Sequence, residues 1–493
     1  MKKAMVLAIL LPVLLLCGGG YAVVKLNGQE DQVVITENVL YGKPEETYGL
    51  TAQISATLYD YFFWDTTHQF GQIPQTKTAT RFCSVRTAQI IPPEYYIELG
   101  DGLSGGMSSY GRWAEMEQVQ LGELSGLERA YWELAQKTQA GEEESANIRL
   151  KDYYDYYPVE VEIHLKDCYY TQGDFRWALY PKAHVNYADG ERGEMLRKIY
   201  REFEQFFRIP VLDTEEKEIH LEKDENGNIC SWGYSGIAES GDRYDLYTTR
   251  VTAEDACYLA IGNRSYEGMI IDTSHIPGGY GLYAVPYTPG DGEQETVVHS
   301  DRLAMVYPLD EREAVRWMQV TQDQQRLVVL TQDEESFTLR VIRREDMVTL
   351  QELRYPAEEE AVEIFHIFWE EDHMLLRLSN ERLVLFSIQR DGTYRLEFSV
   401  EEDPTGELEL PLWSGCAVTD WNGEKLAVLM EDDIRYGDED ATYCGAKLAV
   451  YDGSGLLYCG EYTNSLDTQP GYQGFSRECC MLLDYEPLKI RWN

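Results

Sequence analysis

A pattern of short apolar runs, which returns about every 50 residues between Val315 and Tyr458, constrains the fold more than any other feature. Each repeat contains four runs, and the turn after its first run lies at Asp323, Asp372 or Asn422. Four short antiparallel strands in a repeat of this length are typical of a β-propeller blade. The runs are 315–320, 326–330, 337–342 and 347–350, then 362–369, 374–378, 383–386 and 394–398, then 416–421, 425–429, 447–451 and 456–458.

Weaker copies of the pattern continue toward the N-terminus. Segments 217–221, 229–234 and 244–251 predict a further blade, and 257–298 predicts another, with a strand at Tyr280–Val285. We therefore expect propeller-like β repeats over residues 217–493. Since about seven four-stranded blades close a ring, residues 51–216 are expected to supply the remaining blades, and a separate α+β domain there is the alternative. Helical spacing at 127–135 and 195–207 predicts two helices inserted in this all-β fold.

The first 24 residues predict export. Lys2 and Lys3 precede 21 uncharged residues, Ala4–Val24, and a helix of that length can cross a hydrocarbon core of about 30 Å. The basic flank stays inside, so everything after Lys25 is expected on the extracytoplasmic side of the cell membrane. Residues 25–50 are polar and predict a spacer between the membrane and the folded part.

Three interpretations of the N-terminal segment stay open. A retained signal anchor is expected first, because the apolar run continues through Val24. A lipoprotein signal is the next, because residues 14–18 (LLLCG) resemble a bacterial lipobox, which would make Cys17 a site of lipid attachment. Ordinary secretion, with cleavage after Gly20 and Ala22, is the third. All three place the rest of the chain outside the cytoplasm.

The third repeat resembles a known family. Residues 418–429 (VTDWNGEKLAVL) and 449–455 (AVYDGSG) resemble a blade of TolB-like and related bacterial propellers. The resemblance is strongest over residues 315–462. Together with the N-terminal segment, the chain resembles a surface-anchored propeller protein of a Gram-positive bacterium. The resemblance implies a fold and a compartment, but no activity, because propellers host many functions.

Charge and cysteine content exclude some classes of partner and site. The chain has 86 acidic and 43 basic residues, a formal net charge of −43. Nucleic acid is therefore not expected as a partner, because binding phosphates requires a basic surface. The ten cysteines include no CxxC pair, so neither a zinc knuckle nor a thioredoxin-type site is predicted.

Three short motifs have a chemical and a structural interpretation, and the structural one is favoured in each case. Residues 102–106 have the GxSxG spacing of a nucleophile elbow, but no helix is predicted directly after them. Residues 279–284 spell GxGxxA, again without a following helix. Asp224 to Asn228 begin like a calcium loop, but the glycine comes too early for an EF-hand, so a hairpin turn is expected.

Acidic and aromatic clusters remain as candidate binding features. Residues 431–440 contain six acids, and we expect a solvated loop there, with a bound divalent cation as the alternative. Residues 153–158 and 59–65 interleave aromatic rings with carboxylates, as in sugar sites, although tyrosine is also an ordinary strand residue. Ser274 and His275 are neighbours, but adjacency alone does not predict a catalytic triad.

The expected function is a surface-anchored extracytoplasmic binding or scaffold protein. It would bind an unknown extracellular protein or a cell-envelope glycan, and it would attach to the membrane through its N-terminal segment. We predict no catalytic residue, cofactor or metal ligand, and Cys17 is the only candidate site of modification. The alternative is a carbohydrate-binding or carbohydrate-active enzyme on the same scaffold, which would require paired carboxylates beside exposed tyrosines.

Overall fold

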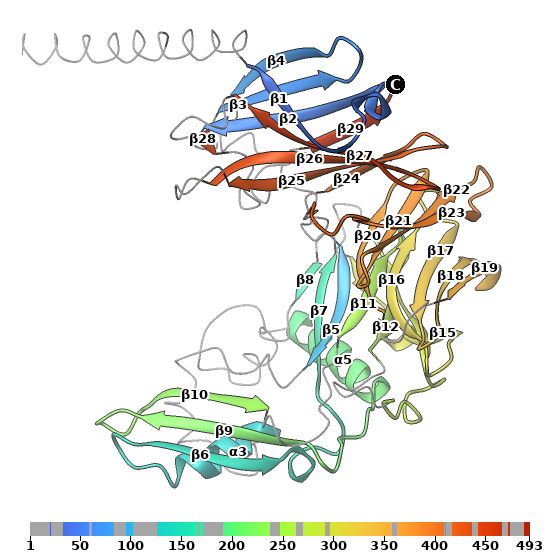
Figure 1. Ribbon diagram of the computed structural model, residues 1–493. Coiled ribbons are helices and arrows are strands. Elements are labelled where there is room, and N and C mark those ends of the chain that lie inside the picture. The colour runs from blue at the N-terminus through green and yellow to red at the C-terminus, as the bar shows by residue number, and fades with distance from the viewer. Residues whose placement is uncertain are drawn as a thin grey trace, which may run out of the picture. The chain divides into compact units, whose positions relative to one another are not determined.

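The computed structural model shows an all-β, β-propeller-like protein with few helices (Figure 1), which confirms the predicted fold class. Seven antiparallel sheets lie in the described part of the chain. The structure describes residue 20 and residues 33–58, 62–82, 95–101, 126–165, 168–170, 191–236, 247–262, 270–290, 296–356, 362–408, 410, 417–435, 442–465, 472–473 and 488–493. Apart from Gly20, the predicted anchor lies outside these ranges, and so does Cys17. No helix within them is long and apolar enough to cross a membrane.

The chain divides into two compact units. The first unit consists of Met1–Pro92 and Ala361–Asn493, and the second of Pro93–Glu360.

The three regular repeats each form one sheet whose strands follow chain order. All twelve predicted strands are present, which confirms the 50-residue pattern. All side chains are buried in two stretches of these strands, residues 327–330 and 426–430. These strands are covered on both faces, and for that reason they read as continuous apolar runs. The strands are β16 (Ala314–Val320), β17 (Arg326–Gln332), β18 (Ser336–Arg343) and β19 (Val348–Pro356), then β20 (Ile364–Trp369), β21 (His373–Leu378), β22 (Arg382–Ile388) and β23 (Tyr394–Glu401), then β24 (Val418–Trp421), β25 (Leu426–Arg435), β26 (Thr442–Asp452) and β27 (Gly455–Asn464).

The acidic segment 431–440 differs from its prediction. β25 continues to Arg435 and pairs with β26 from Thr442 onward. Residues 431–435 are therefore strand and not loop, because the partner strand is long enough to extend the hairpin. The side chains of this segment, and residues 436–441 altogether, lie outside the described part of the chain.

Strands from both ends of the chain complete two sheets of the first unit (Figure 1). β1 (Ile35–Gly42) pairs with β27, and β29 (Leu488–Trp492) pairs with β2 (Leu50–Leu58). Gly42 has φ +73°, and a Cβ there would lie 1.9 Å from the Leu457 carbonyl oxygen, so this end of β1 requires glycine. The remaining elements are η2 (Pro44–Thr47), β3 (Phe62–Gln69), β4 (Gln75–Phe82) and β28 (Tyr472–Gln473).

Besides the sheet of β16–β19 and a three-stranded sheet whose strands lie within residues 143–236, the described part of the second unit contains two further sheets. One joins β5 (Tyr96–Asp101), β7 (Val159–Leu165) and β8 (Cys168–Tyr170). The other joins β11 (Thr248–Thr252), β12 (Ala256–Ile261), β13 (Gly281–Thr288), β14 (Val297–Val298) and β15 (Ala304–Pro308). The strand predicted at Tyr280–Val285 is therefore confirmed as β13, which lies between β12 and β15.

The blade predicted over residues 217–251 is wrong in its strand partners. β9 (Glu216–Lys223) and β10 (Ile229–Gly236) do form a hairpin, but β9 pairs on its other side with β6 (Glu143–Arg149), and β11 belongs to the next sheet. Local pattern reveals a strand and not its partner, and here the partner lies about 70 residues upstream in sequence.

The described part of the second unit contains two α-helices, both where helical spacing predicts them. α3 (Gly126–Ala135) packs against β6 and β9 (Figure 1), and its Tyr131 and Leu134 are buried in the core. α5 (Glu191–Phe206) buries Ile199 and Phe203 in the same core. Two short 3-10 turns, η4 (Leu150–Asp152) and η5 (Ser300–Arg302), complete the elements of this unit.

Candidate binding surface

Two loops of the second unit form a small rigid platform. The Tyr157 amide donates to the Ile209 carbonyl at 2.9 Å, and the Val211 amide donates to the Asp155 carbonyl at 3.2 Å. Tyr156 and Pro210 form a bridge between these two bonds. The loop before β7 and the loop after α5 therefore hold each other in register.

A buried polar group fixes this platform from below. The Tyr157 hydroxyl donates to the Glu215 carboxylate and accepts from the Leu212 amide. Lys217 Nζ lies 3.0 Å from Glu215 Oε1, and both side chains are almost fully buried. Glu215 Oε1 has no directional hydrogen-bond partner among the described residues, so the lysine contact is an ion pair without hydrogen-bond alignment. Breaking such a buried ion pair would leave an uncompensated buried charge, which is costly. The pair therefore stabilises the contact between the two loops.

Three side chains meet on the outer side of the platform. The guanidinium of Arg208 lies 4.0 Å above the centroid of the Tyr156 ring. The Tyr156 hydroxyl lies 3.1 Å from His275 Nδ1, and which of the two donates depends on the tautomer. Arg208 and His275 are exposed, and in the described part of the chain Arg208 has no ion-pair partner. We call Tyr156, Arg208 and His275 the loop surface.

The loop surface joins two features that the sequence singles out separately, the aromatic segment 153–158 and the pair Ser274-His275. Asp272 supports the second of these, because its carboxylate accepts from the Ser274 amide at 2.9 Å. Hydrogen bonds from Ser274, and the nearby His275, hold the pKa of Asp272 below its ordinary value. Arg208 is missed by sequence analysis, because a single arginine after a helix carries no local signal.

The other tyrosines of the segment have structural roles. The Tyr154 hydroxyl accepts from the Leu127 amide at 2.9 Å and so satisfies the first turn of α3. The Tyr153 hydroxyl donates to Glu133 at 3.2 Å. Tyr156 is therefore the member of this segment that remains for a ligand. The side chains of residues 59–64 lie outside the described part of the chain.

A second group, in the first unit, has the connectivity of a catalytic triad. His373 Nδ1 lies 2.6 Å from Asp372, and His373 Nε2 lies 2.8 Å from the Thr419 hydroxyl. The His373 hydrogen bond, against some burial, lowers the pKa of Asp372. The exposed fractions are 1% for His373 and 7% for Thr419, so the hydroxyl is enclosed between β21 and β24. The hydrogen bond between His373 and Thr419 therefore links the sheet of β21 to the sheet of β24.

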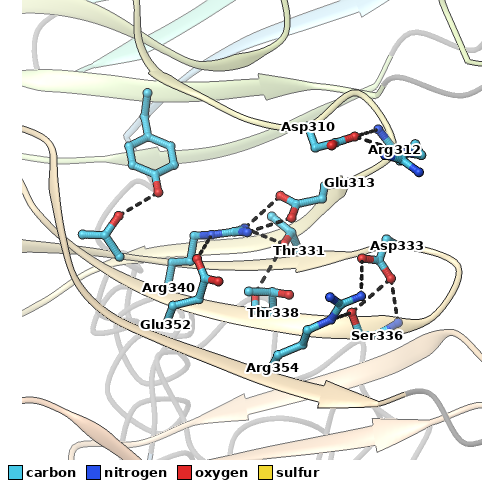
Figure 2. Close-up of polar contacts among 12 residues, drawn as sticks. Asp310, Arg312, Glu313, Thr331, Asp333, Ser336, Thr338, Arg340, Glu352 and Arg354 are labelled. Carbon is cyan, nitrogen blue, oxygen red and sulfur yellow. Dashed lines mark hydrogen bonds and ion pairs between the residues drawn. The ribbon is translucent and has the colours of Figure 1, made fainter.

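A third group, in the second unit, holds one sheet together (Figure 2). Arg340 donates to both oxygens of Glu313 at 2.7 and 2.9 Å, to Glu352 at 2.9 Å, and to the Thr331 hydroxyl at 2.9 Å. Burial acts to lower the pKa of Arg340, but the two glutamates outweigh it and raise the pKa. Arg354 forms a smaller group with Ser336 and Asp333 in the same sheet (Figure 2).

The other sequence motifs have simple structural outcomes. Residues 102–106, the GxSxG segment, lie outside the described ranges. The GxGxxA segment is a turn followed by strand β13, which begins at Gly281. A Cβ at Gly281 would lie 2.2 Å from the Tyr307 carbonyl oxygen, so the close approach of these two strands requires glycine. Asp224 accepts from the amides of Asn226 and Asn228, which confirms the predicted hairpin turn. Cys230 and Cys257 form no disulfide bond within the described part of the chain.

Comparison with known proteins adds information on the fold alone. No protein-family model matches the sequence, and no curated protein matches it either. Three solved structures illustrate the structural likeness. A Saccharomyces cerevisiae structure of Dbp5 bound to Nup159 and Gle1 matches at 10% identity and a TM-score of 0.23, over 54% of this chain and 60% of that chain. This chain thus spans less than two thirds of that protein's length.

The other two structures are a propeller domain and a bacterial protein. The Cps50 (Swd1) β-propeller domain of Myceliophteria thermophila matches at 11% identity and a TM-score of 0.24, over 50% of this chain and 70% of that one. A candidate 6-phosphogluconolactonase of Bacteroides fragilis matches at 8% identity and a TM-score of 0.28, over 90% of this chain and 97% of that one. At this level of likeness, the propeller-like fold rests on the order of the strands in the sheets.

Proposed function

We propose that the chain is a surface-anchored, extracytoplasmic binding or scaffold protein that recognises an extracellular protein or a cell-envelope glycan. The observation that carries this proposal is the loop surface. Binding residues are often presented by loops on a rigid scaffold, and here three loops converge on Tyr156, Arg208 and His275. An aromatic ring beside an unpaired guanidinium is a common feature of recognition sites.

Binding to isolated cell envelopes tests the proposal. The full-length chain in detergent is expected to bind envelopes from a strain that lacks it, and the double variant Arg208→Ala/His275→Ala is expected to bind about tenfold more weakly. Arg302→Ala is the matched control, because Arg302 is an exposed arginine elsewhere in the same unit. Equal binding by the double variant and the wild type would contradict the assignment of the loop surface.

The membrane attachment is a separate part of the proposal, supported by the uncharged segment Ala4–Val24. A retained signal anchor predicts a full-length membrane-bound chain that is accessible to added protease on intact cells. A lipoprotein predicts palmitate labelling that disappears in Cys17→Ser. A chain released into the medium without label would contradict both.

A carbohydrate-binding or carbohydrate-active protein is the second candidate. One observation favours it, since Glu98 of β5 lies directly opposite Glu162 of β7. Paired carboxylates are the groups on which most glycoside hydrolases depend.

A further inference from the structure

The arginine of the loop surface presents hydrogen-bond donors that the described part of the chain does not use. The guanidinium of Arg208 lies 4.0 Å above the centroid of the Tyr156 ring, so the ring supports the group from one side. An arginine has five N–H donors in the plane of its guanidinium and no acceptor. No described residue accepts a hydrogen bond from the Arg208 side chain, and Arg208 is exposed. Its donors are therefore open to a ligand.

The platform holds Tyr156, and through it the guanidinium, in a fixed place. Tyr156 forms the bridge to Pro210 between the two platform loops, and its hydroxyl lies 3.1 Å from His275 Nδ1. Contact with a ring that is held at its backbone and at its hydroxyl restricts the arginine side chain before a ligand arrives. A side chain that is positioned in advance loses less conformational entropy on binding, so its contact contributes more affinity.

The groups around Arg208 add positive charge and a further donor. The Nζ of Lys151 lies 3.3 Å from a carbonyl oxygen of the platform, so a second cation stands on the same two loops. When the tyrosine hydroxyl donates to His275 Nδ1, His275 Nε2 carries the ring proton and is also a donor. Two acids lie in these loops, Asp155 and Asp272, and neither forms an ion pair with Arg208.

A surface that offers donors selects a ligand group that accepts. An ionised carboxylate has two acceptor oxygens and no donor, and its geometry matches the fork of an arginine. A sugar hydroxyl both donates and accepts, so it gains less from a group that only donates. The group that Arg208 contacts is therefore best assigned as a carboxylate.

The charge of the whole chain limits which molecule can carry that carboxylate. The formal net charge is −43, and a potential of this sign repels a polymer with an anionic group in every unit. A protein with a positive overall charge is attracted instead, and one of its carboxylates can still meet Arg208 at short range. Complementary overall charge speeds the encounter, and the local contact fixes the register.

We propose that the loop surface binds a carboxylate side chain of an extracellular protein whose overall charge is positive. This inference rests on the binding function proposed above, and it decides between the two ligand classes given there in favour of a protein. A side chain on the surface of a partner protein can reach Arg208 directly, because both groups are exposed.

Two matched peptides test the carboxylate contact on the full-length chain in detergent. One is a lysine-rich peptide with a single central glutamate, and the other has glutamine in its place. Calorimetry at about 0.15 M salt is expected to show about fivefold tighter binding of the glutamate peptide, as for an exposed ion pair in favourable geometry. Arg208→Ala is expected to abolish this preference, and Arg208→Glu is expected to reverse it. Arg302→Ala is the control and is expected to keep the preference.

Three results would overturn the inference. The first is equal binding of the two peptides by the wild type, and the second is an unchanged preference in Arg208→Ala. The third is tighter binding of polyglucuronate than of the lysine-rich peptides, because it would show that a polyanion and not a basic partner is favoured. Thermal midpoints equal to that of the wild type confirm that the Arg208 variants are folded.

Isolated envelopes separate this inference from the proposed function. Binding that is lost when the envelopes are first treated with trypsin, which is then inactivated, supports a protein ligand. Binding that survives trypsin and is lost after periodate oxidation of the envelopes would overturn the protein assignment and leave the binding function intact. Absence of binding to untreated envelopes, with the peptide preference present, would contradict the function and leave the carboxylate contact in place.

Discussion

Two buried arginines, one in each unit, solve the same electrostatic problem differently. Arg340 in β18 has two glutamates and a threonine hydroxyl as partners. Among the described residues, Arg377 in β21 has one carboxylate partner, Glu402, with Nε 2.6 Å from Oε2, and the exposed fractions of the two side chains are 11% and 4%. The pKa shifts reflect this difference. The two glutamates raise the pKa of Arg340, whereas burial raises the pKa of Glu402 despite the arginine beside it.

The two groups differ in the number of partners and in their exposure. We expect these two properties, more than the mere presence of an ion pair, to decide how much stability is lost when one partner is removed. Glu352 is about half exposed and Glu313 is mostly buried, so the Arg340 group can lose one partner and remain paired. The pair Arg377–Glu402 has no such reserve, because loss of either member leaves a buried charge without compensation.

The largest effect is expected from Arg377→Met. Leaving Glu402 unpaired is expected to lower the free energy of unfolding by about 3–5 kcal/mol. Urea unfolding of the variant and the wild type measures the difference. The double variant Arg377→Met/Glu402→Leu is expected to recover most of the loss, since apolar pairs can replace buried ion pairs. A double variant as unstable as the single one would show that the contact, and not the lone charge, stabilises the fold.

A smaller effect is expected from Glu313→Gln in the Arg340 group. The amide keeps one hydrogen-bond acceptor, and Glu352 still compensates the guanidinium. We expect a loss of about 1–3 kcal/mol, measured by the same urea unfolding. A loss as large as that of Arg377→Met would contradict the idea that the second carboxylate provides reserve.

A still smaller effect is expected from Glu352→Gln. This glutamate is about half exposed, and solvent screens its interaction, so the stability change is expected to stay within about 1 kcal/mol. If Glu352→Gln cost more than Glu313→Gln, the ranking of the two partners by burial would be wrong.

The smallest effect concerns pH. The Asp323 carboxylate accepts from the Thr321 hydroxyl and the Gln325 amide, and the Thr321 bond chiefly lowers its pKa. Its contribution to stability is therefore present above the pKa of the unfolded chain and is lost as pH falls through the folded pKa. Glu402 has a raised pKa, so its contribution is largest in acid and is lost as pH rises.

Thermal midpoints between pH 7 and pH 3 measure this contrast. Asp323→Asn is expected to flatten the acid loss of stability slightly, and Glu402→Gln is expected to change the pH dependence in the opposite direction. Parallel pH profiles for the wild type and both variants would contradict the two pKa directions.

Sequence analysis predicts the regular part of the fold well and the candidate sites poorly. Apolar periodicity is local, so the strands of β16 to β27 and both helices could be placed from it. The partner of β9 could not, because β6 is distant in sequence, and neither could the extension of β25 through acidic residues. Arg208 carries no local pattern, and its role arises only when tertiary structure brings it over Tyr156.

The exchange of end strands has a mechanical consequence. A pull on the residues that precede β1 reaches Val34, whose amide and carbonyl both bond Ser465, and then the β1–β27 ladder, which begins at Ile35 and Asn464. Because β1 is joined to β27 along its length, this load must separate β1 from its neighbour before it reaches β2. The β1–β27 ladder therefore bears tension that is applied from the N-terminal side, and the sheet of β2 is loaded only after this ladder has opened.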